Sequence, residues 1–338
     1  MIYSKDEIKD FIKRVLNTRS EVTLERLKAT GNMTARLEDG GEETLLKAVV
    51  EGREYVVKMK SRQFESNVGD AMNYFGSEEF FKHYKKGKYI FYIRDSVVRE
   101  QQVYSAFGVV KESLPKIYGA QSDKTRSIVI MEKLEISREP KDEELAELLK
   151  KIHGEYPRLE DAVKVGANLH VKEDYLQAKE LSLALIESVK KVFPAFPNEL
   201  LIKARKLAED YGKTYEKMAS FGRCVCHGDL TINNMTTTPS IKLYDWELST
   251  YNNPEFDLVS YLVHYPTLLT DGEINRFLLA YYGDKETLEN KKEALNFNVL
   301  LYFVTRFSAM MMISRKLDMP YMDTSIANYV YLASYLGK

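Results

Sequence analysis

The sequence predicts a two-lobed α+β protein, in which a small antiparallel sheet forms the N-terminal lobe and helices form a larger C-terminal lobe. Between residues 22 and 60, apolar and polar side chains alternate with the period of two that is typical of strands. After residue 134 the apolar residues recur at helical spacing, and from residue 272 onward the chain is rich in Tyr, Phe and Met. A chain of 338 residues is long enough for two lobes, which we expect at 1–133 and 134–338.

The N-terminal lobe is expected to begin with a helix. Ser4 followed by Glu7 has the pattern of a capping box, and the apolar side chains that come next mark one face of that helix. These side chains are Ile8, Phe11, Ile12, Val15 and Leu16. The strands predicted in this lobe lie at 22–29, 33–37, 44–50, 55–60 and 127–131. A second helix is predicted at 96–107, and the aromatic and charged residues 62–94 are interpreted as an insertion.

The C-terminal lobe is predicted to be helical with one interruption. Asp142 is expected to cap a helix that Gly154 closes, and long helices fit residues 172–192 and 198–219. Residues 222–250 break this pattern with two short apolar strands and a Thr-Pro-Ser turn. The functional motifs are expected in this interruption.

Composition excludes several classes of protein. The chain has 49 Lys and Arg against 50 Asp and Glu, so it offers no global field for nucleic acid or an anionic membrane. Its 2 cysteines lie one residue apart, which rules out an extracellular disulfide framework. The N-terminus lacks the apolar core of a signal peptide, and no uncharged apolar run is long enough to span a bilayer. We therefore expect a cytoplasmic protein without membrane insertion or a nucleic-acid partner.

The most informative segment reads Cys-His-Gly-Asp-Leu-Thr-Ile-Asn-Asn at 226–234. Asp229 and Asn234 have the spacing found in the catalytic loop of protein kinases. In phosphoryl transfer, one carboxylate orients and deprotonates the attacking hydroxyl, while a cluster of oxygens holds Mg²⁺ against the nucleotide phosphates. A hairpin just after Asn234 would bring its amide oxygen beside the Asp245 carboxylate. The alternative is a hairpin that contains Asn and Asp only because they favour turns.

The motif at 227–234, followed by Asp-Trp-Glu at 245–247, resembles the aminoglycoside phosphotransferase and choline kinase superfamily. Members of this superfamily are similar in fold to protein kinases but phosphorylate small molecules. The resemblance implies a bilobal protein-kinase-like fold that uses ATP and Mg²⁺. It further implies that Asp229 is the catalytic base, that Asn234 and Asp245 are metal ligands, and that His227 is mainly a structural part of the loop.

Other segments fall where this superfamily places its nucleotide-binding residues. In the strand at 55–60 the alternation puts Lys58 on one face with an apolar residue, and this resembles the strand whose lysine holds the α- and β-phosphates. Lys60, on the same face, is the competing candidate. Glu100 shares a helix face with apolar residues and needs a partner to offset its desolvation. As in the kinase Lys–Glu pair, Lys58 is the expected partner.

Adenine contacts are expected from the main chain around Glu132 and Leu134, where the superfamily has its hinge. The loop that covers the phosphates is left open between residues 30–34 and 39–42, each of which contains glycine. Two glycines between strands also fit an ordinary turn, so the sequence does not decide between these loops.

The stretch from Asp245 to Leu258 resembles choline and ethanolamine kinases, which narrows the expected acceptor to an amino alcohol such as choline or ethanolamine. Those enzymes cage a quaternary ammonium with Trp residues and an acidic residue, whereas this chain contains 1 Trp, at the metal motif. A replacement cage is one interpretation, and ordinary core packing is the other. The proposed cage consists of Tyr261, Tyr265, Phe303 and Phe307. The acceptor-side candidates are Tyr261, His264, Tyr265 and Arg306.

The resulting prediction is an ATP- and Mg²⁺-dependent kinase that phosphorylates a hydroxyl of a small molecule. An aminoglycoside or sugar kinase is the alternative among enzymes, and a non-catalytic pseudokinase-type binding protein is the alternative from another class. A protein kinase is disfavoured because the sequence has no Asp-Phe-Gly and no Ala-Pro-Glu. Two cysteines next to His227 suggest a metal site, but no second Cys or His cluster in the sequence completes four ligands.

Overall fold

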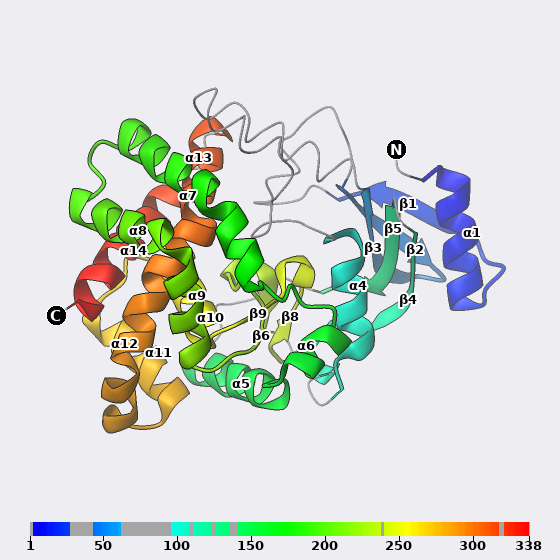
Figure 1. Ribbon diagram of the computed structural model, residues 1–338. Coiled ribbons are helices and arrows are strands. Elements are labelled where there is room, and N and C mark those ends of the chain that lie inside the picture. The colour runs from blue at the N-terminus through cyan, green and yellow to red at the C-terminus, as the bar shows by residue number, and fades with distance from the viewer. Residues whose placement is uncertain are drawn as a thin grey trace.

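The computed structural model describes residues 3–27, 43–61, 96–108, 111–123, 126–134, 141–237, 240–317 and 321–337. Figure 1 shows a sheet with its two flanking helices on one side of the molecule and a larger group of helices on the other. The predicted insertion at 62–94 and both candidate phosphate-covering loops lie outside the described residues.

The N-terminal sheet has five antiparallel strands in the order β1-β2-β3-β5-β4. Their bounds are β1 (Val22–Arg26), β2 (Glu43–Val50), β3 (Arg53–Ser61), β4 (Ile117–Ser122) and β5 (Arg126–Glu132). The strands predicted at 44–50, 55–60 and 127–131 are confirmed, while the one at 33–37 lies outside the described residues. β4 was not predicted, because Gly119, Ala120 and Gln121 give it no apolar alternation.

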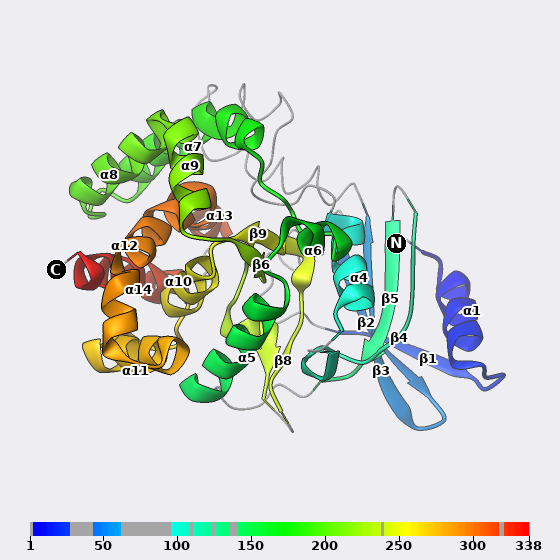
Figure 2. The same ribbon diagram turned by 60° about the horizontal axis from the view of Figure 1, so that its bottom comes forward.

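Two helices cover opposite faces of this sheet (Figure 2). α1 (Lys5–Leu16) begins with the predicted capping box, in which the Glu7 N–H donates to Ser4 Oγ at 3.2 Å. α4 (Ser96–Ala106) packs on the other face, next to the helical lobe. In β3, Val57 and Met59 pack in the core under α1. Because strand side chains alternate, Lys58 must point to the face of α4 and the helical lobe.

The helical lobe contains the remaining long elements. They are α5 (Asp142–Glu155), α6 (Leu159–Lys164), α7 (Lys172–Val192), α8 (Asn198–Glu209), α9 (Tyr211–Ser220), α10 (Glu255–Val263), α11 (Asp271–Tyr282), α12 (Lys285–Tyr302), α13 (Ser308–Leu317) and α14 (Tyr321–Leu336). A π-helical turn, η5 (Phe303–Phe307), joins α12 to α13. None of the helices in the described parts of the chain has the length and apolar content needed to span a bilayer.

Two details of the helical lobe differ from the sequence prediction. The helix predicted at 198–219 is two helices, because Asp210 caps α9 by accepting a hydrogen bond from the Lys213 N–H at 3.3 Å. The residue preceding α5 is Lys141, not Asp142. The Asp142 carboxylate is buried and accepts a hydrogen bond from Arg276 Nε of α11 at 2.6 Å. Asp142 therefore ties two helices together and does not cap one.

Short elements lie between the helices and the sheet (Figure 2). β6 (Cys224–Cys226) pairs with β9 (Thr250–Asn252), and β7 (Met235–Thr236) pairs with β8 (Lys242–Leu243). Between them are the 3₁₀ turns η3 (Ile232–Asn234) and η4 (Trp246–Leu248); a third, η2 (Lys111–Ser113), follows α4. The predicted interruption of the helical lobe is thus confirmed, and it faces α4 and β3.

Candidate active site

The loop after β6, which begins with His227 and Gly228, is held in place by hydrogen bonds to a buried carboxylate. Asp257, on α10, accepts hydrogen bonds from the backbone N–H groups of His227 at 2.7 Å and of Gly228 at 2.8 Å. Its Oδ2 also lies 3.3 Å from His153 Nε2 of α5. The His227 side chain in turn contacts the Tyr244 carbonyl at 2.9 Å. These contacts fix the backbone that presents Asp229.

Gly228 allows the sharp turn into Asp229. Its φ is +81°, a left-handed conformation, and a Cβ at this position would lie 2.1 Å from the Leu248 carbonyl oxygen. Only glycine fits there without moving the backbone of η4.

Asp229 and Asn234 lie together, as their spacing predicts. The Asn234 Nδ2 donates to the Asp229 backbone oxygen at 2.8 Å and to its carboxylate Oδ2 at 3.0 Å. Burial raises the pKa of the Asp229 carboxyl above its ordinary value, and the nearby Arg306 guanidinium opposes this rise. Because the Asn234 amide nitrogen is used in this contact, its amide oxygen is the atom left for a cation.

The predicted hairpin brings Asp245 to the same place. β7 and β8 pair in antiparallel register, and the Tyr244 N–H donates to the Asn234 carbonyl at 3.0 Å. Asp245 has a φ of +66°, a conformation that Asp tolerates better than most residues. Its backbone N–H donates to the Tyr104 hydroxyl of α4 at 3.2 Å. The turn after β8 is therefore anchored to the N-terminal lobe.

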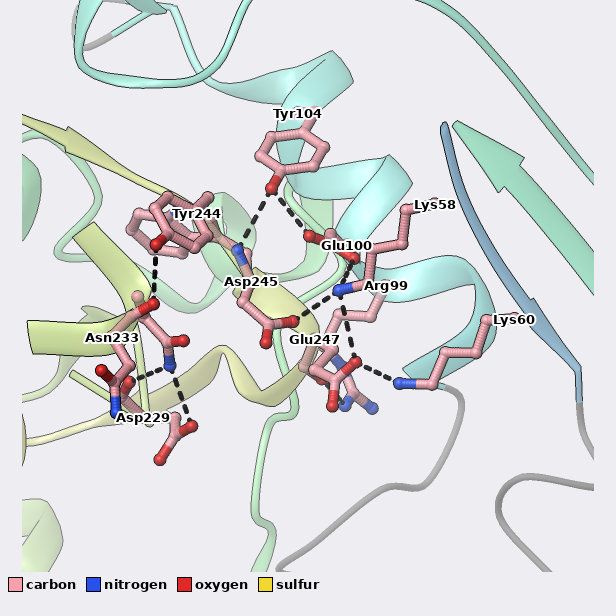
Figure 3. A network of polar contacts seen from close by, with 12 residues as sticks. Lys58, Lys60, Arg99, Glu100, Tyr104, Asp229, Asn233, Tyr244, Asp245 and Glu247 are labelled. Atoms are coloured by element: carbon pink, nitrogen blue, oxygen red, sulfur yellow. Dashed lines mark hydrogen bonds and ion pairs between the residues drawn. The ribbon is translucent and has the colours of Figure 1, made fainter. Parts of the chain in front are cut away.

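Lys58 of β3 lies at the centre of a charged cluster (Figure 3). Its Nζ is 2.7 Å from Glu100 Oε2 and 2.6 Å from Asp245 Oδ1. The Tyr104 hydroxyl donates to the other Glu100 oxygen at 2.7 Å. Burial acts to raise the pKa of Asp245, but the ammonium groups of Lys58 and Lys60 outweigh it and hold this pKa below its usual value. The expected contact between Lys58 and Glu100 is thus present.

A second buried cation, Lys60, lies two residues beyond Lys58 on β3 and forms an ion pair with Glu247 (Figure 3). Glu247 follows Asp245 by two residues, and its backbone oxygen accepts a hydrogen bond from Arg99 Nη1 at 2.7 Å. Carboxylate oxygens of Glu100, Asp245 and Glu247 lie within 4.8 Å of one another. The sequence indicated that Lys60 shares the face of Lys58 but gave no partner for it.

The two hinge candidates lie at the end of β5, with Glu132 as its last residue and Leu134 two residues further on. The Glu132 N–H donates to the Lys116 carbonyl at 2.9 Å, and its carboxylate accepts from the Lys116 N–H at 2.8 Å. The same carboxylate forms an ion pair with Lys242 of β8, which belongs to the helical lobe. Leu134 is half-buried just beyond the strand.

The acceptor-side candidates occupy different places. Arg306, in η5, is buried and donates from Nη2 to the Leu248 carbonyl at 3.2 Å, beside the loop that carries Asp229. His264 contacts the Tyr302 hydroxyl at 3.0 Å through Nε2, and burial lowers its pKa to about 4. Tyr261 and Tyr265 contact each other edge to face at 5.7 Å.

The structure does not bring the four rings of the proposed cage together. Tyr261 packs on Phe277 of α11, with ring centroids 4.7 Å apart. Phe303 and Phe307 both contact Tyr329 of α14, at 5.4 Å and 5.1 Å. Tyr261, Phe303 and Phe307 are buried in the core of the helical lobe, which matches the core-packing interpretation, and Tyr265 is half-buried.

His153, Cys224 and Cys226 are buried side by side beneath this loop. His153 is hydrogen-bonded at both ring nitrogens, to Tyr281 at 2.8 Å and to Asp257. Burial acts to lower its pKa, but the hydrogen bond to Asp257 outweighs it and raises the pKa to about 9. With both ring nitrogens hydrogen-bonded, His153 acts as a structural cation. The two cysteines lie in the buried strand β6.

The comparisons with known proteins agree with this geometry. A model of the phosphotransferase enzyme family matches residues 97–290, more than half of the chain. The chain therefore belongs to the phosphotransferase enzyme family, and the predicted enzyme class, a small-molecule phosphotransferase, is confirmed. No curated protein matches the sequence significantly.

Solved structures support the same fold. The structure of LicA in complex with AMP is 17% identical and covers 99% of both chains, with a TM-score of 0.56. Spectinomycin phosphotransferase APH(9)-Ia, in complex with ADP and spectinomycin, is 11% identical over 100% of this chain and 98% of its own, with a TM-score of 0.53. Choline kinase LicA from Streptococcus pneumoniae is 16% identical over 98% and 99%, with a TM-score of 0.50. At these identities the likeness concerns the fold, and it confirms the predicted bilobal protein-kinase-like α+β class.

Proposed function

We propose that this phosphotransferase transfers the γ-phosphoryl group of ATP to a hydroxyl of a small amino alcohol, of which choline and ethanolamine are examples. The observation that carries the proposal is the convergence of Asp229, Asn234 and Asp245 opposite the Lys58–Glu100 pair. Phosphoryl transfer requires a positioned base, oxygen ligands for a divalent cation and a cation for the phosphates. For these roles we propose Asp229, the oxygens of Asn234 and Asp245, and Lys58.

The donor set fits Mg²⁺, which prefers oxygen ligands and takes only one or two from carboxylates. Asp245 supplies a carboxylate, and Asn234 supplies the amide oxygen that its contact with Asp229 leaves over. When bound, the ion neutralises charge on the nucleotide phosphates. Lys58, positioned by Glu100, holds the α- and β-phosphates, and the main chain around Glu132 and Leu134 contacts adenine.

Asp229 acts on the acceptor. Its carboxylate orients the attacking hydroxyl and accepts the proton, while Asn234 keeps that carboxylate in place through its amide nitrogen. On the acceptor side, Arg306 lies beside the loop that carries Asp229. We propose that the acceptor binds next to Arg306 and Asp229.

The nucleotide and the acceptor class are tested together by measuring ADP release from Mg·ATP with choline, ethanolamine, spectinomycin and buffer alone. We expect release that requires an amino alcohol and stops when EDTA removes the divalent cation. Release with spectinomycin alone would assign the aminoglycoside alternative, in line with the likeness to APH(9)-Ia. A protein that binds no Mg·ATP at millimolar concentration would contradict the proposal and support the pseudokinase alternative.

A further inference from the structure

β3 carries two buried lysines on one face, and their nearest carboxylates in the described part of the chain differ. Lys58 and Lys60 are 8% and 3% exposed and are separated by one residue that points into the other core. Lys58 contacts Glu100 and Asp245, whereas Lys60 contacts Glu247. A lysine in a strand is usually solvated, so two buried ones on the nucleotide-facing side need an explanation.

Glu247 lies within reach of both lysines. Its Oε2 forms the ion pair with Lys60 and is 3.8 Å from the Lys58 Nζ, which is ion-pair distance but beyond hydrogen-bond distance. Its backbone oxygen is held by Arg99, so η4 keeps this carboxylate close to β3. With Lys60 removed, Lys58 is the ammonium to which Glu247 is already near.

Most of the N–H donors of the Lys58 ammonium are already used by carboxylates. An ammonium carries three N–H donors, and Glu100 and Asp245 accept at 2.7 Å and 2.6 Å. A phosphate oxygen and a released Glu247 carboxylate would therefore compete for the same ammonium. Because such charge-assisted contacts are strong in a buried site, the competition would weaken nucleotide binding.

We propose that Lys60 is a positioning residue that retains Glu247 and so leaves Lys58 available to the nucleotide. The inference rests on the proposed function, because it takes Lys58 as the phosphate-binding lysine. It separates the two candidates on β3: Lys58 contacts the nucleotide, and Lys60 acts through Glu247.

The test compares four variants for binding of Mg·AMP-PNP, a non-hydrolysable ATP analogue, by titration calorimetry. Lys60→Met is expected to raise its dissociation constant about tenfold, the change that follows from weakening one charge-assisted contact. Lys60→Arg retains the charge and is expected to bind within about threefold of the wild type. Lys47→Met is the matched control, since Lys47 lies on the same sheet and pairs with Glu25 and Glu54.

The double variant Lys60→Met with Glu247→Gln decides the mechanism. If Lys60 acts by retaining Glu247, removing the negative charge of Glu247 restores binding, and the double variant binds more tightly than Lys60→Met alone. If the double variant binds no more tightly than Lys60→Met, Lys60 does not act through Glu247 and the proposal is wrong. It is also wrong if Lys60→Met binds as tightly as the wild type.

Tryptophan fluorescence, which needs no ligand, shows whether each variant is folded. Trp246, the single Trp of the chain, is buried between Asp245 and Glu247, so its emission reports on η4. Variants are compared only when their unfolding transitions are cooperative, and Lys60→Arg keeps the test open if Lys60→Met does not fold. Failure of the wild type to bind Mg·AMP-PNP contradicts the proposed function, whereas wild-type binding that Lys60→Met leaves unchanged contradicts this inference alone.

Discussion

At the scale of single residues, one buried carboxylate, that of Asp257, fixes the loop that presents Asp229. The contact between Asp229 and Asn234 and the hairpin that leads to Asp245 are present as predicted, because a short loop and a hairpin leave few arrangements. Asp257 falls within the stretch from Asp245 to Leu258, and the sequence alone predicts no separate role for it. A carboxylate within the apolar run of α10 signals that a buried partner exists, but not that the partners are two backbone N–H groups and His153.

The ion pair of His153 with Asp257 predicts a dependence of stability on pH. The folded pKa of His153 is about 9, above the unfolded value of 6.5, so its contribution is fully present below pH 6.5 and is lost as pH rises through about 9. This group alone accounts for a fall of up to about 3 kcal/mol in the free energy of unfolding. Urea unfolding of the wild type and of His153→Gln across this range checks it. Equal pH slopes for the two proteins would contradict the assignment.

At the scale of elements, the spacing of apolar residues predicted which way side chains face more accurately than it predicted where helices and strands end. The period of two in β3 put Lys58 and Lys60 on one face, and the structure agrees. The helix predicted at 198–219 was too long, because its apolar spacing continues across Asp210 although the chain turns there. β4 was missed since its small residues carry no alternation. β4 is stabilised by its pairing with β5, and this contact cannot be predicted from the pattern of apolar residues within β4 itself.

Gly52 and Gly228 have similar φ angles, but we predict that replacing them by alanine lowers the free energy of unfolding by different amounts. Gly52, in the turn between β2 and β3, has a φ of +76°, and a Cβ added there would meet no atom within 4 Å. Gly52→Ala should therefore cost about 1–2 kcal/mol for the backbone alone. Gly228→Ala adds the clash with the Leu248 carbonyl oxygen, worth about 1–3 kcal/mol more, and should also displace Asp229. The check is urea unfolding of both variants, together with ADP release. Equal costs in stability and equal retained activity would argue against the tight contact of the loop with η4.

At the scale of the whole molecule, polar contacts join the sheet to the helical lobe at the candidate site. Lys58 reaches Asp245, Tyr104 accepts from the Asp245 N–H, and Glu132 pairs with Lys242. The predicted fold class is confirmed. It could be predicted because strand-like alternation in one part of the chain and helical spacing in the other are strong signals. The partners across the lobes were not predictable, since contacts between residues more than a hundred positions apart leave no local pattern.

The most direct measurement of the central claim is the turnover of Asp229→Asn, with its Mg·ATP dissociation constant measured in parallel and Asp323→Asn as an exposed control. The substitution removes the proton acceptor and leaves the shape of the side chain, so we predict that turnover falls by about 10²- to 10⁴-fold. The dissociation constant should stay close to that of the wild type, because Lys58, Asn234 and Asp245 remain. Near-full turnover in Asp229→Asn would contradict the account.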